Sequence, residues 1–181
     1  GKKLIIAEKP SVALDISKAL GGFTKHDDYY ESDDYVLSSA VGHLLALICP
    51  EEFEVNRGKW TFAHLPVIPP HFDLQPIEKS APRLKVLQKL LRRKDVDGLI
   101  NAAGVNHFGL FDGMDDTAIE QMVALNLTAT LQLTHAMLPL LRERPRATVV
   151  FLGSIFGSIG YPGQAVYSAT KFALRGFAEA L

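Results

Sequence analysis

Three side chains in the last third of the sequence have types and spacing that suit proton transfer. Tyr167 and Lys171 are four positions apart, so a helix would place the phenol and the ammonium on one face. An ammonium beside a phenol favours the phenolate, which brings a group with an ordinary pKa of about 10 closer to acid and base work near neutrality. Ser154 lies 13 positions before Tyr167 and adds a hydroxyl.

A carboxylate near the start of the sequence is a second candidate. Glu8 follows the apolar run LIIA and stands at the carboxyl end of a predicted strand, where open α/β sheets bind their ligands. One carboxylate cannot hold magnesium by itself, because the ion needs several hard oxygen ligands. The six histidines show no spacing typical of metal ligands. Glu8 is therefore a metal candidate without partners.

Alternating strand and helix patterns must position these groups. Apolar runs predict strands at 3–7, 35–40, 98–103 and 147–153, with a further short strand at 74–77. Helical spacing predicts helices at 10–20, 81–94, 115–141 and 165–181. This order predicts a single three-layer, doubly wound α/β domain with a mainly parallel sheet and an irregular, Pro-rich insertion around 43–77. Strands 3–7 and 98–102 should be central neighbours, with 147–152 further out.

The helix predicted over 81–94 is amphipathic. Its leucines should face the core, and its basic side chains should be solvated rather than bound to phosphate. The expected inward residues are Leu84, Leu87, Leu90 and Leu91, and the outward ones are Arg83, Lys85, Lys89, Arg92 and Arg93.

The composition excludes several classes of protein. With 19 basic and 20 acidic residues, the net charge is -1, so no global field attracts nucleic acid or a membrane. The single Cys49 cannot form an internal disulfide, and no apolar run reaches the roughly 20 residues of a membrane span. We therefore expect a cytoplasmic protein with no membrane partner, for which nucleic acid is an unfavoured partner.

Charge is distributed unevenly along the sequence. Residues 1–97 hold 28 Lys, Arg, Asp and Glu residues, whereas residues 98–181 hold only 11. This difference in charge content indicates that the two parts come from different sources.

The first part resembles the Toprim domain of type IA topoisomerases, most closely topoisomerase III. The resemblance covers about residues 2–100 and rests on LIIAEKPS at 4–11, YYESDDYVLSSAVGHL at 29–44 and RGKWTFAHLPVIPPHF at 57–72. It implies that Glu8 and an aspartate pair after a later strand hold magnesium for DNA cleavage. The sequence after that strand reads NAAGVNHFG and has no carboxylate before Asp112. Topoisomerase activity is therefore excluded.

The second part resembles the classical short-chain dehydrogenase/reductase family over about residues 97–181. The matching motifs are INAAG at 100–104, Asn126 in ALNLTA and GSIFGSIGYPGQAVYSATK at 153–171. The resemblance implies a Rossmann fold with Tyr167 as acid and base, Ser154 on the substrate carbonyl, Asn126 ordering a water, and an NAD(P) cofactor. It also implies that Asn101 and Gly104 bind that cofactor.

The first strand-to-helix turn lacks what such a cofactor needs. A dinucleotide pyrophosphate approaches the backbone at a glycine-rich turn before a helix. Here the turn reads AEKPS: Glu8 adds a negative charge, Pro10 removes an N–H donor, and no glycine is present. We therefore expect no bound cofactor, and Ser154, Tyr167 and Lys171 as inherited rather than working residues.

Two family signatures that meet at one strand, each with an incomplete site, favour a designed chimera. We interpret residues 1–97 as Toprim-derived and 98–181 as Rossmann-derived, joined near 96–103, where either parent has a buried parallel strand. The expected function is that of a fold-evolution test scaffold and not of an enzyme. Two alternatives stay open: a residual NAD(P)-binding oxidoreductase, and a Toprim-type remnant that binds magnesium or nucleic acid. No specific partner is expected beyond a homodimer through an exposed sheet edge.

Overall fold

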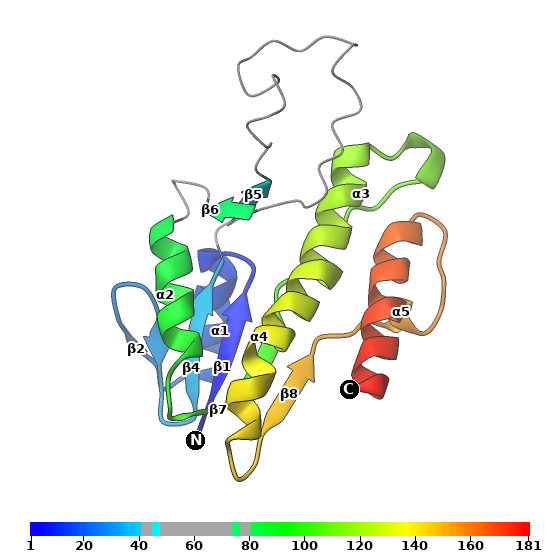
Figure 1. The fold of residues 1–181 in the computed structure, drawn as a ribbon. Helices are drawn as coiled ribbons and strands as arrows, with labels where there is room; N and C mark the ends of the chain where they lie inside the picture. Colours follow the sequence, from blue (N-terminus) through cyan, green and yellow to red (C-terminus); the bar gives the residue numbers. More distant parts are fainter. Residues whose placement is uncertain (41–44, 48–73, 77–80) are drawn as a thin grey trace, which may run out of the picture.

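A six-stranded, mostly parallel sheet organises the computed structural model, which describes residues 1–40, 45–47, 74–76 and 81–181 (Figure 1). The strand order is β2-β3-β4-β1-β7-β8. The parallel strands are β1 (Lys2–Ala7), β4 (Tyr35–Ser39), β7 (Val96–Ala102) and β8 (Thr148–Phe151). The antiparallel strands at one edge are β2 (Thr24–Lys25) and β3 (Tyr30–Glu31). The predicted α/β class with a mainly parallel sheet is confirmed.

The centre of the sheet joins the two parts of the sequence. β1 lies between β4 and β7, with Leu4 opposite Leu99 and Ile5 opposite Ile100, and β8 follows on the far side of β7. The predicted neighbours 3–7 and 98–102 are therefore confirmed. At Gly98 the neighbouring strands β1 and β8 come close to the backbone of β7, because a Cβ there would be 2.8 Å from Lys3 Cγ and 3.2 Å from the Thr148 carbonyl oxygen.

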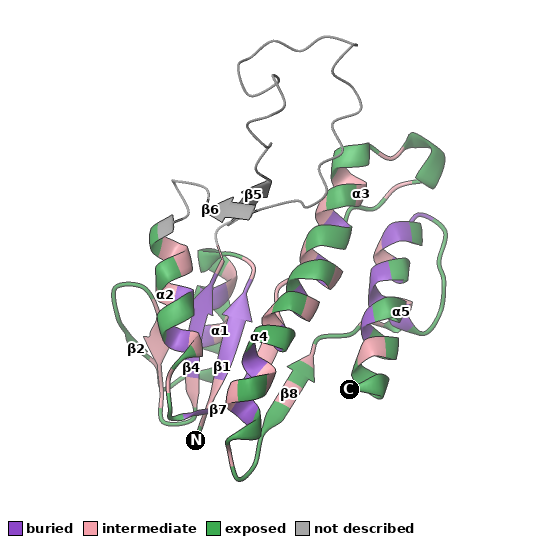
Figure 2. Ribbon diagram, in the orientation of Figure 1, coloured by how far each residue is buried: buried purple, intermediate pink, exposed green. Residues whose placement is uncertain are grey.

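Helices cover both faces of this sheet. They are α1 (Pro10–Leu20), α2 (Ala81–Leu91), α3 (Asp116–Val123), α4 (Thr130–Arg142) and α5 (Ala165–Ala180). Neighbouring residues of a strand point to opposite faces. Leu4 packs in one cluster with residues of α2 and α4, whereas Ile5 packs in another with Ala13 of α1. Figure 2 shows buried residues along β1 and β4 and on parts of the helices. The sheet therefore has a layer of helices on each face, with a separate hydrophobic cluster under each layer.

The helix predicted over 115–141 is not a single regular helix. α3 and α4 are joined by a π-helical segment, η5 (Ala124–Ala129), so the run is continuous but wider in the middle. α1 and α5 lie where expected, and Pro10 occupies the first turn of α1. Two short 3-10 turns, η4 (Phe111–Gly113) and η6 (Ile155–Gly157), follow β7 and β8.

Most of the insertion predicted around 43–77 lies outside the described residues. The exception is a two-stranded antiparallel pair, β5 (Leu45–Leu47) with β6 (Leu74–Pro76). The short strand predicted at 74–77 is observed as β6. Among the helices that the structure describes, none combines the length and the apolar character that a membrane span requires.

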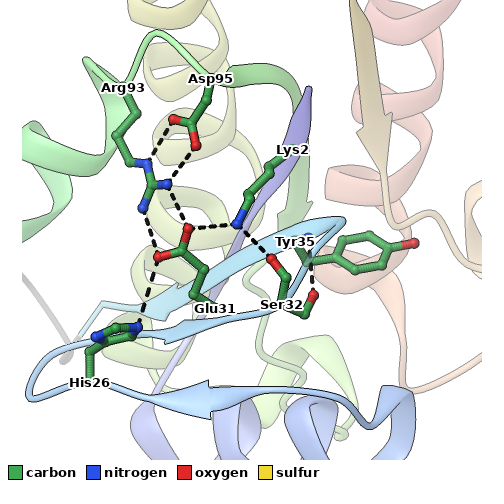
Figure 3. Close-up of polar contacts among 7 residues, drawn as sticks. All are labelled: Lys2, His26, Glu31, Ser32, Tyr35, Arg93 and Asp95. Atoms are coloured by element: carbon green, nitrogen blue, oxygen red, sulfur yellow. Dashed lines mark hydrogen bonds and ion pairs between the residues drawn. The ribbon is translucent and has the colours of Figure 1, made fainter.

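The β2–β3 hairpin was not predicted from the sequence, and an ion cluster fixes it to the sheet (Figure 3). Glu31 Oε1 accepts hydrogen bonds from Lys2 Nζ and from an Arg93 guanidinium nitrogen, both at 2.7 Å. Arg93 also binds Asp95 at 2.6 Å. The expectation that Arg93 is simply solvated is wrong, because it closes this cluster beside the end of α2. Arg83 likewise donates to the Asp28 carbonyl at 2.7 Å.

This cluster makes the stability of the fold depend on pH. The guanidinium of Arg93 and the ammonium of Lys2 lower the pKa of Glu31 from 4.5 to about 2. Since the folded value lies below the unfolded one, the stabilisation is complete above about pH 4.5 and is lost as the pH falls toward 2.

We expect Glu31→Gln to lower the free energy of unfolding at pH 7 by about 1–2 kcal/mol, because a charged hydrogen-bonded acceptor is lost. The difference from the parent should shrink below pH 3. Urea unfolding at both pH values measures it. Glu179→Gln is the matched control, since its pair with Arg175 is exposed; an equal loss in both variants would show that Glu31 contributes no more than a surface pair.

The strand β8 forms the edge of the sheet opposite the β2–β3 hairpin. In the described part of the chain β8 has a strand neighbour on one side only, and its sequence TVVF carries no charge. Val150 is 36% exposed and Leu152, just beyond, is 49% exposed. An uncharged edge of this kind is a template for pairing with another strand.

The homodimer expected from the sequence stays a prediction, with antiparallel pairing of β8 to β8 as its geometry. We expect mass to rise with concentration in light-scattering chromatography for the parent, and Val150→Lys to remain monomeric because a charged side chain on an edge strand opposes pairing with another strand. A monomeric parent at every concentration would rule this dimer out.

Candidate active site

The carboxyl ends of the parallel strands bring the candidate residues to one edge of the sheet. The chain leaves β1 toward α1 on one face and leaves β7 toward α3 and α4 on the other. The carboxyl ends of β1 and β7 are therefore the switch point, the place where open α/β sheets bind ligands. Glu8 follows β1, Gly104 follows β7, and Ser154 follows β8.

Asn126 is fixed at this edge by the π-helical segment. It is 1% exposed, and its amide forms two hydrogen bonds of 2.8 Å with the backbone N–H and carbonyl of Val105. Its Nδ2 also donates to Thr170 Oγ1 on α5 at 3.3 Å. Widened π turns inside helices are frequent at functional sites. Asn126 therefore holds the loop after β7 against α5.

Lys171 lies deep beside the same loop. It is 6% exposed, and its Nζ donates to the Leu152 carbonyl at 2.7 Å. Burial lowers the pKa of Lys171 below its usual value. A Cβ on Gly104 would be 3.8 Å from this Nζ and 3.4 Å from Asn126 Oδ1. The start of the loop after β7 therefore lies within van der Waals distance of both groups.

Tyr167 and Lys171 share one face of α5, as their spacing predicts. The Lys171 Nζ is 5.6 Å from the centre of the Tyr167 ring. Phe156 packs edge-on to this ring at 6.4 Å, which connects Tyr167 to the turn after β8. The phenol is half-buried, so it has both a defined position and access to solvent.

Ser154 caps the short η6 turn. Its Oγ accepts the Phe156 N–H at 3.2 Å, so the hydroxyl hydrogen is left to donate elsewhere. Ser154 and Lys171 line one pocket of about 210 Å³ that also contacts Leu174. The pocket lining does not include Tyr167 or Asn126. Lys171 is the residue that links the four, because it shares the pocket with Ser154, lies 5.6 Å from the Tyr167 ring centre, and borders Gly104 together with Asn126.

Asn101 lies apart from these residues. It is 5% exposed, and its Nδ2 lies 3.4 Å from Thr134 Oγ1 on α4, which itself donates to the Thr130 carbonyl. The amide thus points into the layer between the sheet and α4. Its predicted cofactor role stays a prediction.

No metal centre surrounds Glu8 in the described residues, where no group of three His, Cys, Asp or Glu side chains is placed to hold an ion. Glu8 is half-buried at the end of β1. The magnesium or nucleic-acid alternative stays a prediction.

The first strand-to-helix turn does not fit the pyrophosphate of a dinucleotide. Lys9 is the extended residue before α1 and makes no side-chain cap, and Pro10 begins the helix without an N–H. The Ala13 N–H makes the first helical bond, to the Lys9 carbonyl at 3.1 Å, so Ser11 and Val12 supply the backbone donors of the first turn. Each residue from 8 to 11 carries a Cβ, so the backbone is not open to close approach.

Residues 64–181 match the family model described as short chain dehydrogenase, so the chain belongs to that family. The match begins well before residue 97, where the resemblance was expected to start.

Solved dehydrogenases share the fold. A bulky-bulky ketone specific alcohol dehydrogenase from Comamonas testosteroni superposes over 100% of this chain and 56% of its own, with a TM-score of 0.60 and 19% identity. A short-chain dehydrogenase from Streptomyces avermitilis superposes over 99% of this chain and 60% of its own, with a TM-score of 0.57 and 22% identity.

The chain is also similar to DNA topoisomerase 3. The Bacillus thuringiensis enzyme is 36% identical over 108 residues, and the Staphylococcus aureus enzyme is 35% identical over the same length. The matched segment is 60% of this chain but only 15% of either relative. The chain thus combines a topoisomerase-like segment with a short-chain dehydrogenase domain, as the two resemblances predicted.

The expectation that the chain is not an enzyme is wrong. The family match points to an oxidoreductase, and the dehydrogenase neighbours show the same fold. That expectation rested mainly on the turn after β1. The residues Ser154, Asn126 and Lys171 are positioned by β8, η5 and α5, and none of these elements depends on that turn.

Proposed function

We propose that this protein is an oxidoreductase of the short-chain dehydrogenase type that acts on a ketone or alcohol. The observation that supports it most is the placement of a buried ammonium, Lys171 Nζ, 5.6 Å from the centre of the Tyr167 ring. Because Leu152 and Asn126 fix the surroundings of this pair, the geometry is set before any substrate binds.

Each residue has a chemical task in this proposal. The Tyr167 hydroxyl donates a proton to the substrate oxygen as that oxygen gains negative charge during reduction, and accepts it back during oxidation. The Lys171 ammonium holds a positive charge beside the ring that gives up the proton. The Ser154 hydroxyl, whose oxygen already accepts the Phe156 N–H, donates its hydrogen to the substrate oxygen.

The family implies NAD(P) as the cofactor that exchanges hydride with the substrate. The turn after β1 does not fit its pyrophosphate, so the proposal depends on the residues from β7 onward. The single Cys49 agrees with a reducing compartment, and a cytoplasmic location is part of the proposal.

Ketone reduction with NADPH or NADH at high concentration tests this function. We expect saturable turnover in the parent and a loss of about 100-fold in kcat/KM for Ser154→Ala, the usual effect of removing one donor to a developing oxyanion. Thr24→Ala is the control, because it also removes a hydroxyl but Thr24 is exposed on β2, at the edge of the sheet opposite β8, and it should stay within about twofold. Equal activity in both variants, or none in the parent, would contradict the proposal.

We also propose that residues 1–181 form one domain engineered from two parents, a Toprim-derived part at 1–97 and a Rossmann-derived part at 98–181. Two observations support this: the topoisomerase-like and dehydrogenase-like matches, and a sheet in which β1 pairs with β7. Unfolding should then show a single transition, which the Leu99→Ala experiment in the Discussion monitors.

A further inference from the structure

The pocket between the end of β8 and α5 has a volume of about 210 Å³. One wall is a single face of α5, formed by Lys171, Leu174, Arg175 and Ala178. The other wall is the segment from the end of β8 to η6, formed by Phe151, Gly153, Ser154, Gly157 and Ser158. A Cβ at Gly157 would be 3.0 Å from the Lys171 carbonyl oxygen, so this segment packs closely on α5. The two walls are therefore fixed relative to each other.

The two serines that line this pocket have hydroxyl hydrogens to spare. Ser154 Oγ accepts the Phe156 N–H at 3.2 Å. Ser158 Oγ accepts a hydrogen bond from Arg175 Nη1 at 3.1 Å. Because each oxygen acts as an acceptor here, each hydroxyl hydrogen is left to donate to a ligand.

Two cations give the same lining a positive charge. Arg175 Nε binds Glu179 at 2.7 Å and Nη1 binds Ser158, so the guanidinium is held beside the pocket. In the described part of the chain its Nη2 makes no hydrogen bond, and the planar guanidinium matches the two oxygens of a carboxylate. Lys171 Nζ uses one of its three hydrogens on the Leu152 carbonyl. None of the described residues that line the pocket is Asp or Glu, so the lining is complementary to an anion.

The rest of the lining is apolar. Phe151, Leu174 and Ala178 contribute a ring and aliphatic groups, and Leu174 is only 3% exposed. An ion without hydrocarbon would leave this surface in contact with water. The volume is below the roughly 300–1,000 Å³ of pockets for drug-sized ligands, which limits the ligand to one ring or a short chain.

We propose that this pocket binds a small organic carboxylate that carries one aromatic ring or a short hydrocarbon chain. The carboxylate accepts hydrogen bonds from Arg175 and from the Ser158 hydroxyl, and the hydrocarbon packs on Phe151 and Leu174. Because Ser154 also lines the pocket, the bound acid competes for the hydroxyl that the proposed function assigns to the substrate oxygen. The binding itself does not rest on the proposed function, since it needs neither cofactor nor ketone.

Calorimetric titration of the full chain with benzoate, benzamide and inorganic phosphate separates the two parts of the pocket. Benzamide has the ring without the charge, and phosphate has the charge without the ring. We expect saturable binding of benzoate, with a dissociation constant at least tenfold lower than that of either of the others. Benzamide that binds as tightly as benzoate, or phosphate that does so, would overturn the proposal.

Arg175→Gln should weaken benzoate about tenfold, because a charge-assisted hydrogen bond is lost, and leave benzamide within twofold. Arg142→Gln is the matched control. It removes the same charge from an exposed residue at the end of α4 that does not line the pocket, so it should change neither constant.

Ala178→Leu should fill the pocket and weaken both benzoate and benzamide at least tenfold. Ala173→Leu is its control, because Ala173 is exposed on the same helix but outside the pocket. Circular dichroism confirms that each variant is folded. Unchanged benzoate binding in Arg175→Gln or in Ala178→Leu, or no saturable binding in the parent, would overturn the proposal and leave the proposed function standing.

Discussion

Tyr167→Phe is expected to lower kcat for ketone reduction by about 100- to 1,000-fold, because the phenylalanine ring keeps the packing but has no proton to transfer. Its ring should retain the edge-on contact with Phe156, so the fold should not change. Since the proton moves only as the substrate oxygen gains charge, KM should change far less than kcat. Steady-state kinetics with the ketone varied at fixed cofactor concentration measures both.

Tyr161→Phe is the matched control for this substitution. Tyr161 also packs on Phe156, at 5.7 Å, but it is 55% exposed and outside the proposed machinery. Its loss of a hydroxyl should leave kcat within about twofold. If Tyr167→Phe kept more than a third of the parent kcat, another group would have to supply the proton, and Tyr167 would lose its assigned role.

Leu99→Ala is expected to lower the free energy of unfolding by about 2–5 kcal/mol, the range for truncating a buried leucine. Leu99 is 0% exposed in the middle of β7 and packs in the cluster that joins Leu4, Leu90 and Met137. For a chain of this size the melting temperature should fall by roughly 5–15 °C. Calorimetry and urea unfolding measure the two quantities.

This substitution also tests the single domain, because Leu99 lies on the strand where the two parts meet. One cooperative transition in the parent, shifted as a whole in the variant, is the expected result. Leu110→Ala is the control, since Leu110 is 68% exposed and should change stability by less than about 0.5 kcal/mol. Two transitions, of which only one moves, would divide the chain into separate domains.

Several features of the fold followed from local sequence patterns. The run LIIA and the run at 98–102 were identified as central parallel strands because both are short, apolar and separated by helical patterns. The spacing of Tyr167 and Lys171 placed both on one face of α5, since a helix returns to the same face after four residues.

The β2–β3 hairpin left no comparable pattern. Its strands are two residues long and are fixed by Glu31, whose partners Lys2 and Arg93 are 29 and 62 positions away. Ion pairs over such separations have no local signature, so an arginine that appeared to be solvated on an amphipathic helix is in fact part of the cluster.

The sequence by itself determined the alternation of strands and helices, the helical spacing of Tyr167 and Lys171, and the composition of the turn after β1, because each depends on residues that are neighbours along the chain. Only the tertiary structure decided that Asn126 binds Val105 through a π turn, that Lys171 is held by Leu152, and that Asn101 points away from the site. Those contacts join residues up to 33 positions apart, and they form only when the sheet brings the ends of its strands together.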